Sequence, residues 1–113
     1  MTETHPIQTD AIRSLNDDFR RAFVGGAILI TAGVEAQPTT LRRVLLQKVR
    51  EFLSFDANND PHDEHDFGAI DEAGLKFFWK IDYYDRDMAA HSPDPADPDV
   101  TTRVLTIMLA EEY

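Results

Sequence analysis

The most chemically distinctive segment of this chain is the acidic loop DANNDPHDEHD, which carries carboxylates, amides and two histidines. Asp56, Asn58 and Asp60 have the one-three-five spacing of oxygen ligands in a calcium-binding loop. Pro61 and Phe67, however, stand where such a loop requires glycine and a bidentate glutamate. The loop is therefore not an EF-hand, and any cation it holds would need a different set of ligands.

A transition metal is the alternative cation for this loop. His62 and His65, together with Asp60 and Asp66, offer the imidazole and carboxylate ligands that suit zinc, iron or manganese. The same residues also fit a loop whose Asn and Asp side chains form turns by hydrogen-bonding the backbone while their charges stay solvated. We therefore expect no cofactor, with a divalent metal ion as the alternative.

A catalytic use of the same region is a further alternative. His65 would act as general base, Asp66 or Asp82 would orient it, and Lys80 or Tyr84 would donate a proton or stabilise an oxyanion. The sequence contains no nucleophile motif and no glycine-rich phosphate loop. It therefore favours a protein that is not an enzyme.

Charge is divided unevenly along the chain. Residues 1–53 carry seven Lys or Arg and six Asp or Glu, whereas residues 54–113 carry four and fifteen. An acidic surface repels nucleic acid and anionic membranes and attracts basic proteins, although it also simply favours solubility. The sequence predicts an acidic interaction module that binds a basic protein surface, with the contact residues Asp63, Glu64, Asp66, Asp94 and Asp97.

The elements that must position these residues form one α+β domain over residues 9–113, after a disordered tail at 1–8. The apolar content of 42% is ordinary for a globular chain, and the absence of cysteine suits the cytoplasm. Apolar spacing and turn residues predict a small three-stranded sheet packed with about three helices. The predicted elements are a helix after Thr9-Asp10, a buried strand at 27–30, a helix from 38–40, a hairpin of strands 67–71 and 75–84, and a helix from Asp97.

The longer hairpin strand alternates between two faces. Leu75, Phe77, Trp79, Ile81 and Tyr83 share one face, which we expect to be the core face, with Trp79 largely buried. If Ile70 pairs with Leu75, then Gly68 lies opposite Phe77 and leaves room for its ring. A slip of one residue would exchange the two faces.

The predicted terminal helix has Asp97 as its N-cap and Pro98 in its first turn, and its apolar residues extend almost all round it. Such a helix is either central to the domain or covered by a second copy, so a homodimer through it is one expectation. Arg42, Arg43 or Arg50 would then balance its acidic end.

The segments GGAILITAGV, NNDPHDEHDFGAI, FFWKIDYYD and SPDPADPDVTTRVLTIMLAEEY resemble a family of small bacterial proteins catalogued as domain of unknown function number thirty-seven sixty-eight. The resemblance covers nearly the whole chain. It implies an accessory protein of plasmids or other mobile elements, and it brings no activity and no catalytic residues to this sequence.

Overall fold

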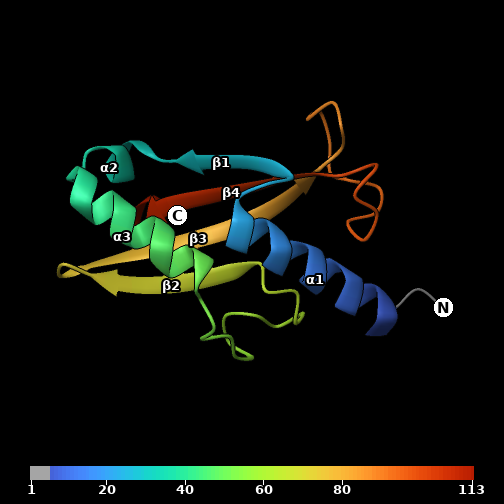
Figure 1. Cartoon of the computed structure of the whole chain (residues 1–113), viewed down its shortest axis with the longest axis horizontal. Helices are drawn as coiled ribbons and strands as arrows, with labels where there is room; N and C mark the ends of the chain where they lie inside the picture. The colour runs from blue at the N-terminus through green and yellow to red at the C-terminus, as the bar shows by residue number, and fades with distance from the viewer. Residues whose placement is uncertain (1–5) are drawn as a thin grey trace.

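A computed structural model describes residues 6–113 and shows a four-stranded sheet with its two longer helices on one face (Figure 1). Of the predicted tail, residues 1–5 lie outside this range and Pro6–Gln8 belong to the first helix. The α+β prediction is confirmed, but the sheet has four strands and not three. In chain order the elements are α1 Pro6–Ala22, β1 Gly26–Ile30, α2 Ala32–Glu35, α3 Thr39–Arg50, β2 Phe67–Glu72, β3 Leu75–Tyr84, β4 Thr102–Leu109 and the 3₁₀ turn η1 Ala110–Glu112.

The predicted terminal helix is wrong, because its residues form β4 in the middle of the sheet. The strand order is β1-β4-β3-β2, with β4 parallel to β1 and antiparallel to β3. Both faces of β4 carry buried apolar residues, Leu105 and Ile107 on the helix face and Val104 and Met108 on the other, which explains apolar residues all round without a helix. Its β-branched residues also favour a strand. A homodimer through a terminal helix is therefore ruled out.

Glu112, near the C-terminus, forms hydrogen bonds with other groups than the arginines that were predicted to balance its charge. Both carboxylate oxygens of Glu112 are used: Oε1 accepts from Thr31 Oγ1 at 2.6 Å, and Oε2 accepts from the Gly33 backbone N–H at 3.0 Å. These hydrogen bonds lower the pKa of Glu112. The end of the chain is thus tied to the segment that follows β1.

The predicted hairpin forms, with a register two residues away from the one expected. Glu72 pairs with Leu75 across a two-residue turn, and Gly68 lies opposite Trp79 instead of Phe77. Ala73 and Gly74 both have positive φ, at 54° and 77°, as a type I′ turn requires. A shift of two residues preserves the faces, so the predicted core face of β3 is retained.

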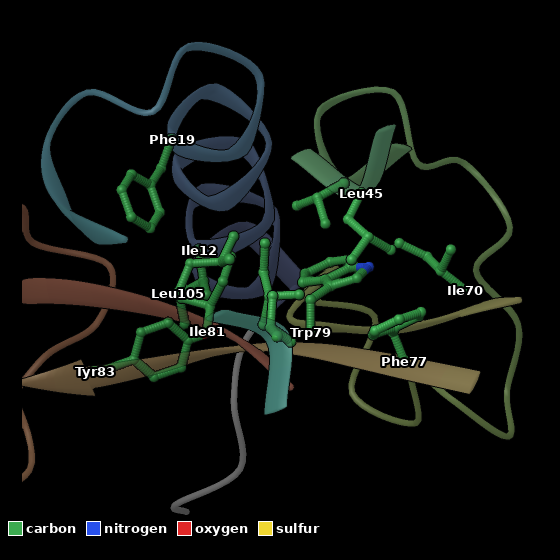
Figure 2. Packing of buried hydrophobic residues seen from close by; sticks show 12 residues of the cluster. Ile12, Phe19, Leu45, Ile70, Phe77, Trp79, Ile81, Tyr83 and Leu105 are labelled. Atoms are coloured by element: carbon green, nitrogen blue, oxygen red, sulfur yellow. The ribbon is translucent and has the colours of Figure 1, made fainter. Parts of the chain in front are cut away.

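The core lies between the sheet and the pair α1 and α3. Trp79 is fully buried, as predicted, and Figure 2 shows it among Leu45, Ile81 and Leu105. Gly68 is needed beside it, because a Cβ there would lie 2.7 Å from Trp79 Cε2 and 2.8 Å from Phe52 Cζ. Packing against the indole therefore fixes the start of β2.

The strand β1 is an edge strand and not the buried strand predicted from its apolar sequence. Leu29 is 52% exposed and Ile30 is 37% exposed. On the sheet face away from the helices, side chains of Phe67, Phe78 and Tyr113 cluster together, with Phe67 and Phe78 ring centroids 5.1 Å apart. Within residues 6–113, no helix is long and apolar enough to cross a membrane.

Candidate functional site

The fold brings the two acidic loops of the chain to one end of the sheet. Residues 55–66 lead into β2, and residues 82–99 include the end of β3 and the connection toward β4. Because β3 runs antiparallel to both neighbours, these three strand ends meet at the same end of the sheet (Figure 1). We call residues 55–66 and 82–99 the acidic end. It holds eleven of the chain's 21 Asp and Glu residues and one of its 11 Lys and Arg residues, Arg86.

Several carboxylates of the acidic end are held in place by backbone hydrogen bonds. Asp60 is buried and accepts from the N–H groups of Glu64 at 2.9 Å and His65 at 3.2 Å. Asp94 accepts from the N–H of Ala96, and Asp97 from that of Asp99. These are the turn-forming contacts that favour Asp and Asn in loops. They fix where the charges lie before any partner arrives.

One face of α1 packs against the first acidic loop and orients His65. The imidazole stacks on Phe55 with ring centroids 3.9 Å apart, and its Nδ1 lies 2.9 Å from Asp17 Oδ1. Its Nε2 lies 3.8 Å from Asp60 Oδ2 and 3.9 Å from Asp63 Oδ1. When a carboxylate accepts a hydrogen bond from the Nδ1–H of a histidine, the lone pair on Nε2 is left free to bind a proton or a metal.

A buried polar network joins α1, β3, β4 and the same loop. The Asn16 amide donates to Tyr83 Oη at 2.7 Å, and Tyr83 donates in turn to Glu64 Oε1 at 2.8 Å. Asn16 Oδ1 accepts from Arg103 Nε at 2.7 Å. Burial raises the pKa of Tyr83, so the phenol stays protonated and can donate to Glu64. Glu64 is therefore anchored and only partly available to a partner.

Asp66 lies between two clefts on the other side of the loop. One, of about 410 Å³, is lined by His62, Asp66, Lys80 and Asp82 among others. The second, of about 340 Å³, is lined by Asp66, Asp82, Tyr84 and His91 and so connects the two acidic loops. Burial, followed by repulsion from Glu64 and Asp60, raises the pKa of Asp66 to about 6. A cation in either cleft would stabilise its ionised form.

Comparison with known proteins gives one match. The model of the family described as "Protein of unknown function (DUF3768)" matches residues 30–112. The chain belongs to this family. No curated protein and no solved structure matches it. The matched DUF3768 region contains the whole acidic end and the strands β2 to β4, whereas α1 lies outside it.

The DUF3768 fold separates the residues of the predicted catalytic set. His65 lies on the helix side of the sheet against Phe55, not opposite Lys80, which pairs with Phe67. Lys80 forms an ion pair with Asp82, their Nζ and Oδ2 atoms 2.9 Å apart, on the opposite face, where Tyr84 also lies. The acid-base arrangement predicted from His65, Lys80, Asp82 and Tyr84 therefore does not come together.

The predicted metal ligands are also divided between two places. The side chains of Asp60 and His65 come together with Asp63, and one ligand atom from each of the three lies within 4.8 Å of the other two. His62 and Asp66 instead line the larger cleft. Among residues 6–113, the three-residue group is the one cluster of His and carboxylate side chains with metal-ligand spacing.

The five predicted contact residues differ in how available they are. Asp63 has a 72% exposed side chain and forms an ion pair with Arg13 at 2.8 Å. Glu64, Asp66, Asp94 and Asp97 are half-buried. Within the acidic end, the exposed acidic residues that the prediction omitted are Asp56, Asp87 and Asp99.

Sequence reasoning also missed the residues of α1 that support this site. Asn16 and Asp17 match the helical pattern and carry no motif, yet they orient Tyr83 and His65. Asn16 lies four residues after Ile12 and three before Phe19, within the buried stripe of the helix. A polar residue in an apolar stripe needs a buried hydrogen-bonding partner, and this was the available signal.

Proposed function

We propose that this chain is a cytoplasmic protein-binding module whose acidic end docks on a basic surface of another protein. The observation that carries the proposal is the joining of two acidic loops at one end of the sheet. The two loops contain eleven carboxylates and one arginine, and Arg13 and Lys80 from neighbouring elements pair with only two of these carboxylates, Asp63 and Asp82. Such a surface speeds association with cationic partners and disfavours nucleic acid. The wider role of a bacterial mobile-element accessory protein is part of the proposal and rests on the sequence resemblance alone.

The fixed positions of the charges support this proposal. Carboxylates held by turns lose little conformational freedom on binding, so less of the interaction energy is spent on ordering them. Burial raises the pKa of Asp66 most, and repulsion from Glu64 and Asp60 raises it further, so neighbouring negative charge adds to the cost of ionising this group. A lysine or arginine side chain from a partner would relieve that repulsion.

The test compares two triple variants that change net charge equally. One neutralises the acidic end by Asp63→Asn, Asp87→Asn and Asp97→Asn. The control neutralises exposed carboxylates at the opposite end by Glu35→Gln, Asp71→Asn and Glu111→Gln. Binding of a labelled arginine-rich peptide is followed by fluorescence anisotropy at several salt concentrations.

We expect the acidic-end variant to bind the peptide roughly tenfold more weakly, because three surface contacts of up to about 1 kcal/mol each are lost. The control should lose about twofold or less, since only long-range attraction changes. Equal losses in the two variants would mean that net charge, and not this surface, attracts the peptide.

A divalent metal site is the second candidate function, and the orientation of His65 favours it. Asp17 holds Nδ1, while Nε2 faces Asp60 and Asp63, which is the carboxylate–histidine arrangement found behind metal ligands. We propose Asp60, Asp63 and His65 as the ligands, with zinc or manganese as the ions their chemistry suits.

Titration calorimetry of the untagged protein with zinc chloride and with manganese chloride tests this second candidate. His65→Ala should abolish binding, and Asp17→Asn should weaken it about tenfold to a hundredfold by freeing the imidazole. His62→Ala is the matched control, because His62 lies in the separate cleft. The assignment would be contradicted if the His62→Ala variant no longer released heat on metal binding while the His65→Ala variant still did.

A further inference from the structure

The outer edge of β1 carries none of the features that usually prevent edge strands from pairing. The segment from Val24 to Val34 contains no charge and no proline. Natural edge strands are normally protected by lysine, proline, a bulge or a covering element. β1 pairs only with β4 and lies at the upper margin of the sheet in Figure 1. It also holds two of the exposed large apolar side chains of the molecule, Leu29 and Ile30.

The backbone groups that β1 offers to a partner follow from one hydrogen bond. The Thr31 N–H donates to the Ile107 carbonyl of β4 at 3.1 Å. In a parallel ladder, alternate residues of a strand bond to the same neighbour, so Ala27 and Leu29 also face β4. Gly26, Ile28 and Ile30 then direct their N–H and C=O groups outward. Within residues 6–113, no other strand or loop pairs with that edge.

We infer that β1 pairs antiparallel with β1 of a second copy of this chain, joining two four-stranded sheets into one continuous eight-stranded sheet. The two-fold axis passes beside Ile28. In this register Ile28 exchanges two hydrogen bonds with its counterpart, and Gly26 exchanges two with Ile30 at each end. All outward groups of the strand are then satisfied, and a shifted register would leave some of them without a partner.

The side chains of β1 fit the same register. On the sheet face away from the helices, the exposed Leu29 of one copy lies opposite Ala27 of the other. On the helix face, Ile30 lies opposite Gly26, which has no side chain. Leu29 and Ile30 thus each meet a small residue, and Ile28 meets its own copy on the axis. This self-complementary order, GAILI against ILIAG, identifies a second copy as the occupant.

Antiparallel pairing also keeps the acidic ends of the two copies apart. β1 is parallel to β4 and begins at the acidic end, so reversing one strand against the other places the acidic end of each copy beside the opposite end of its partner's sheet. β1 is separated from β2 by two strands, so pairing does not bring the first acidic loops of the two copies together.

Sedimentation of the full untagged chain, from low micromolar to several hundred micromolar, tests the inference. We expect a monomer–dimer equilibrium in which Leu29→Lys raises the dissociation constant roughly tenfold or more, because a charge on an edge strand opposes pairing. Leu53→Lys is the control, since Leu53 is 78% exposed and lies outside β1. It should leave the dissociation constant unchanged. A wild-type chain that stays monomeric, or a dimer that Leu29→Lys does not weaken, overturns the inference.

Two further measurements separate this contact from a folding defect. Ala27→Leu should weaken the dimer by opposing leucine to leucine, and adding Leu29→Ala to the same chain should restore it. Amide exchange of Ile28 and Ile30 should slow as concentration rises, while that of Leu29, already bonded to β4, should not change. The proposed register is contradicted if a folded double variant does not regain dimer affinity. It is also contradicted if the exchange rates of the Ile28 and Ile30 amides do not depend on protein concentration.

Discussion

Asp66→Asn should stabilise the fold at neutral pH, because the native carboxylate is ionised in an unfavourable place. Burial and repulsion from Glu64 and Asp60 raise its pKa from 3.8 to about 6, and His62 only partly offsets this. Each pKa unit corresponds to about 1.36 kcal/mol, so ionising Asp66 would cost the folded state up to about 3 kcal/mol. The carboxyl group is partly exposed, and screening by solvent reduces the expected gain to about 1–2 kcal/mol.

The sign of the pH dependence follows from the two pKa values. Between 3.8 and about 6 the folded chain keeps the Asp66 proton and the unfolded chain has released it. The stability that the protonated group contributes is therefore fully present below pH 3.8 and is lost as pH rises through 6. The advantage of Asp66→Asn should be small near pH 4 and complete above about pH 7. Lys80 and Asp82, which line the same cleft, are left unchanged by the substitution.

Urea unfolding of wild type and variant across this pH range measures the effect as a difference in free energy of unfolding. Asp71→Asn is the control, because Asp71 is an exposed carboxylate near the other end of β2, paired with Lys76 at 3.1 Å. It should change stability by about 0.5 kcal/mol or less at every pH. An Asp66→Asn variant that is destabilised, or whose effect does not vary with pH, would refute the reasoning about crowded charge.

Three core substitutions test the packing that positions the acidic end, each by urea unfolding. Trp79→Ala should lower the free energy of unfolding by about 3–5 kcal/mol, because the indole is fully buried. A loss below about 1 kcal/mol would show that the ring is not buried in the core. Gly68→Ala should cost about 1–3 kcal/mol through overlap with Trp79 and Phe52, and adding Trp79→Phe should recover part of that loss. Tyr83→Phe should cost about 1–3 kcal/mol, because the Asn16 amide and the Glu64 carboxylate lose their partner; an unchanged midpoint would show that water replaces the phenol.

Local patterns predicted most elements of the sheet and helices because each has one buried face. The alternation of Leu75 to Tyr84 identified the core face of β3, and the Ala73-Gly74 turn fixed the hairpin. The prediction for residues 102–109 failed because β4 carries buried apolar residues on both of its faces and so shows no period of two. Asp97 and Pro98 imitate the start of a helix, although Asp97 in fact forms a turn with Asp99.

The candidate site was only partly predictable for a different reason. Its acidic residues are visible in the sequence, and the predicted hairpin brings the two loops, residues 55–66 and 82–99, to the same end of the sheet. The contacts that fix His65 come from Asp17, 48 positions earlier in the chain. Such long-range pairing depends on how α1 packs on the sheet and leaves no local pattern. Grouping His62 with His65 failed because the loop turns through positive φ at Asp63 and His65 and directs the two rings to different sides.

Mapping a basic ligand onto the protein by NMR tests the central claim most directly. An arginine-rich peptide is titrated into isotope-labelled protein, and the backbone amide shifts are followed residue by residue. We predict that the largest shifts fall in residues 55–66 and 82–99, with the Asp66 amide among them, and that they fade as salt is added. Shifts spread evenly over all exposed carboxylates, or concentrated at Glu35, Asp71 and Glu111, would contradict the acidic end as a binding surface.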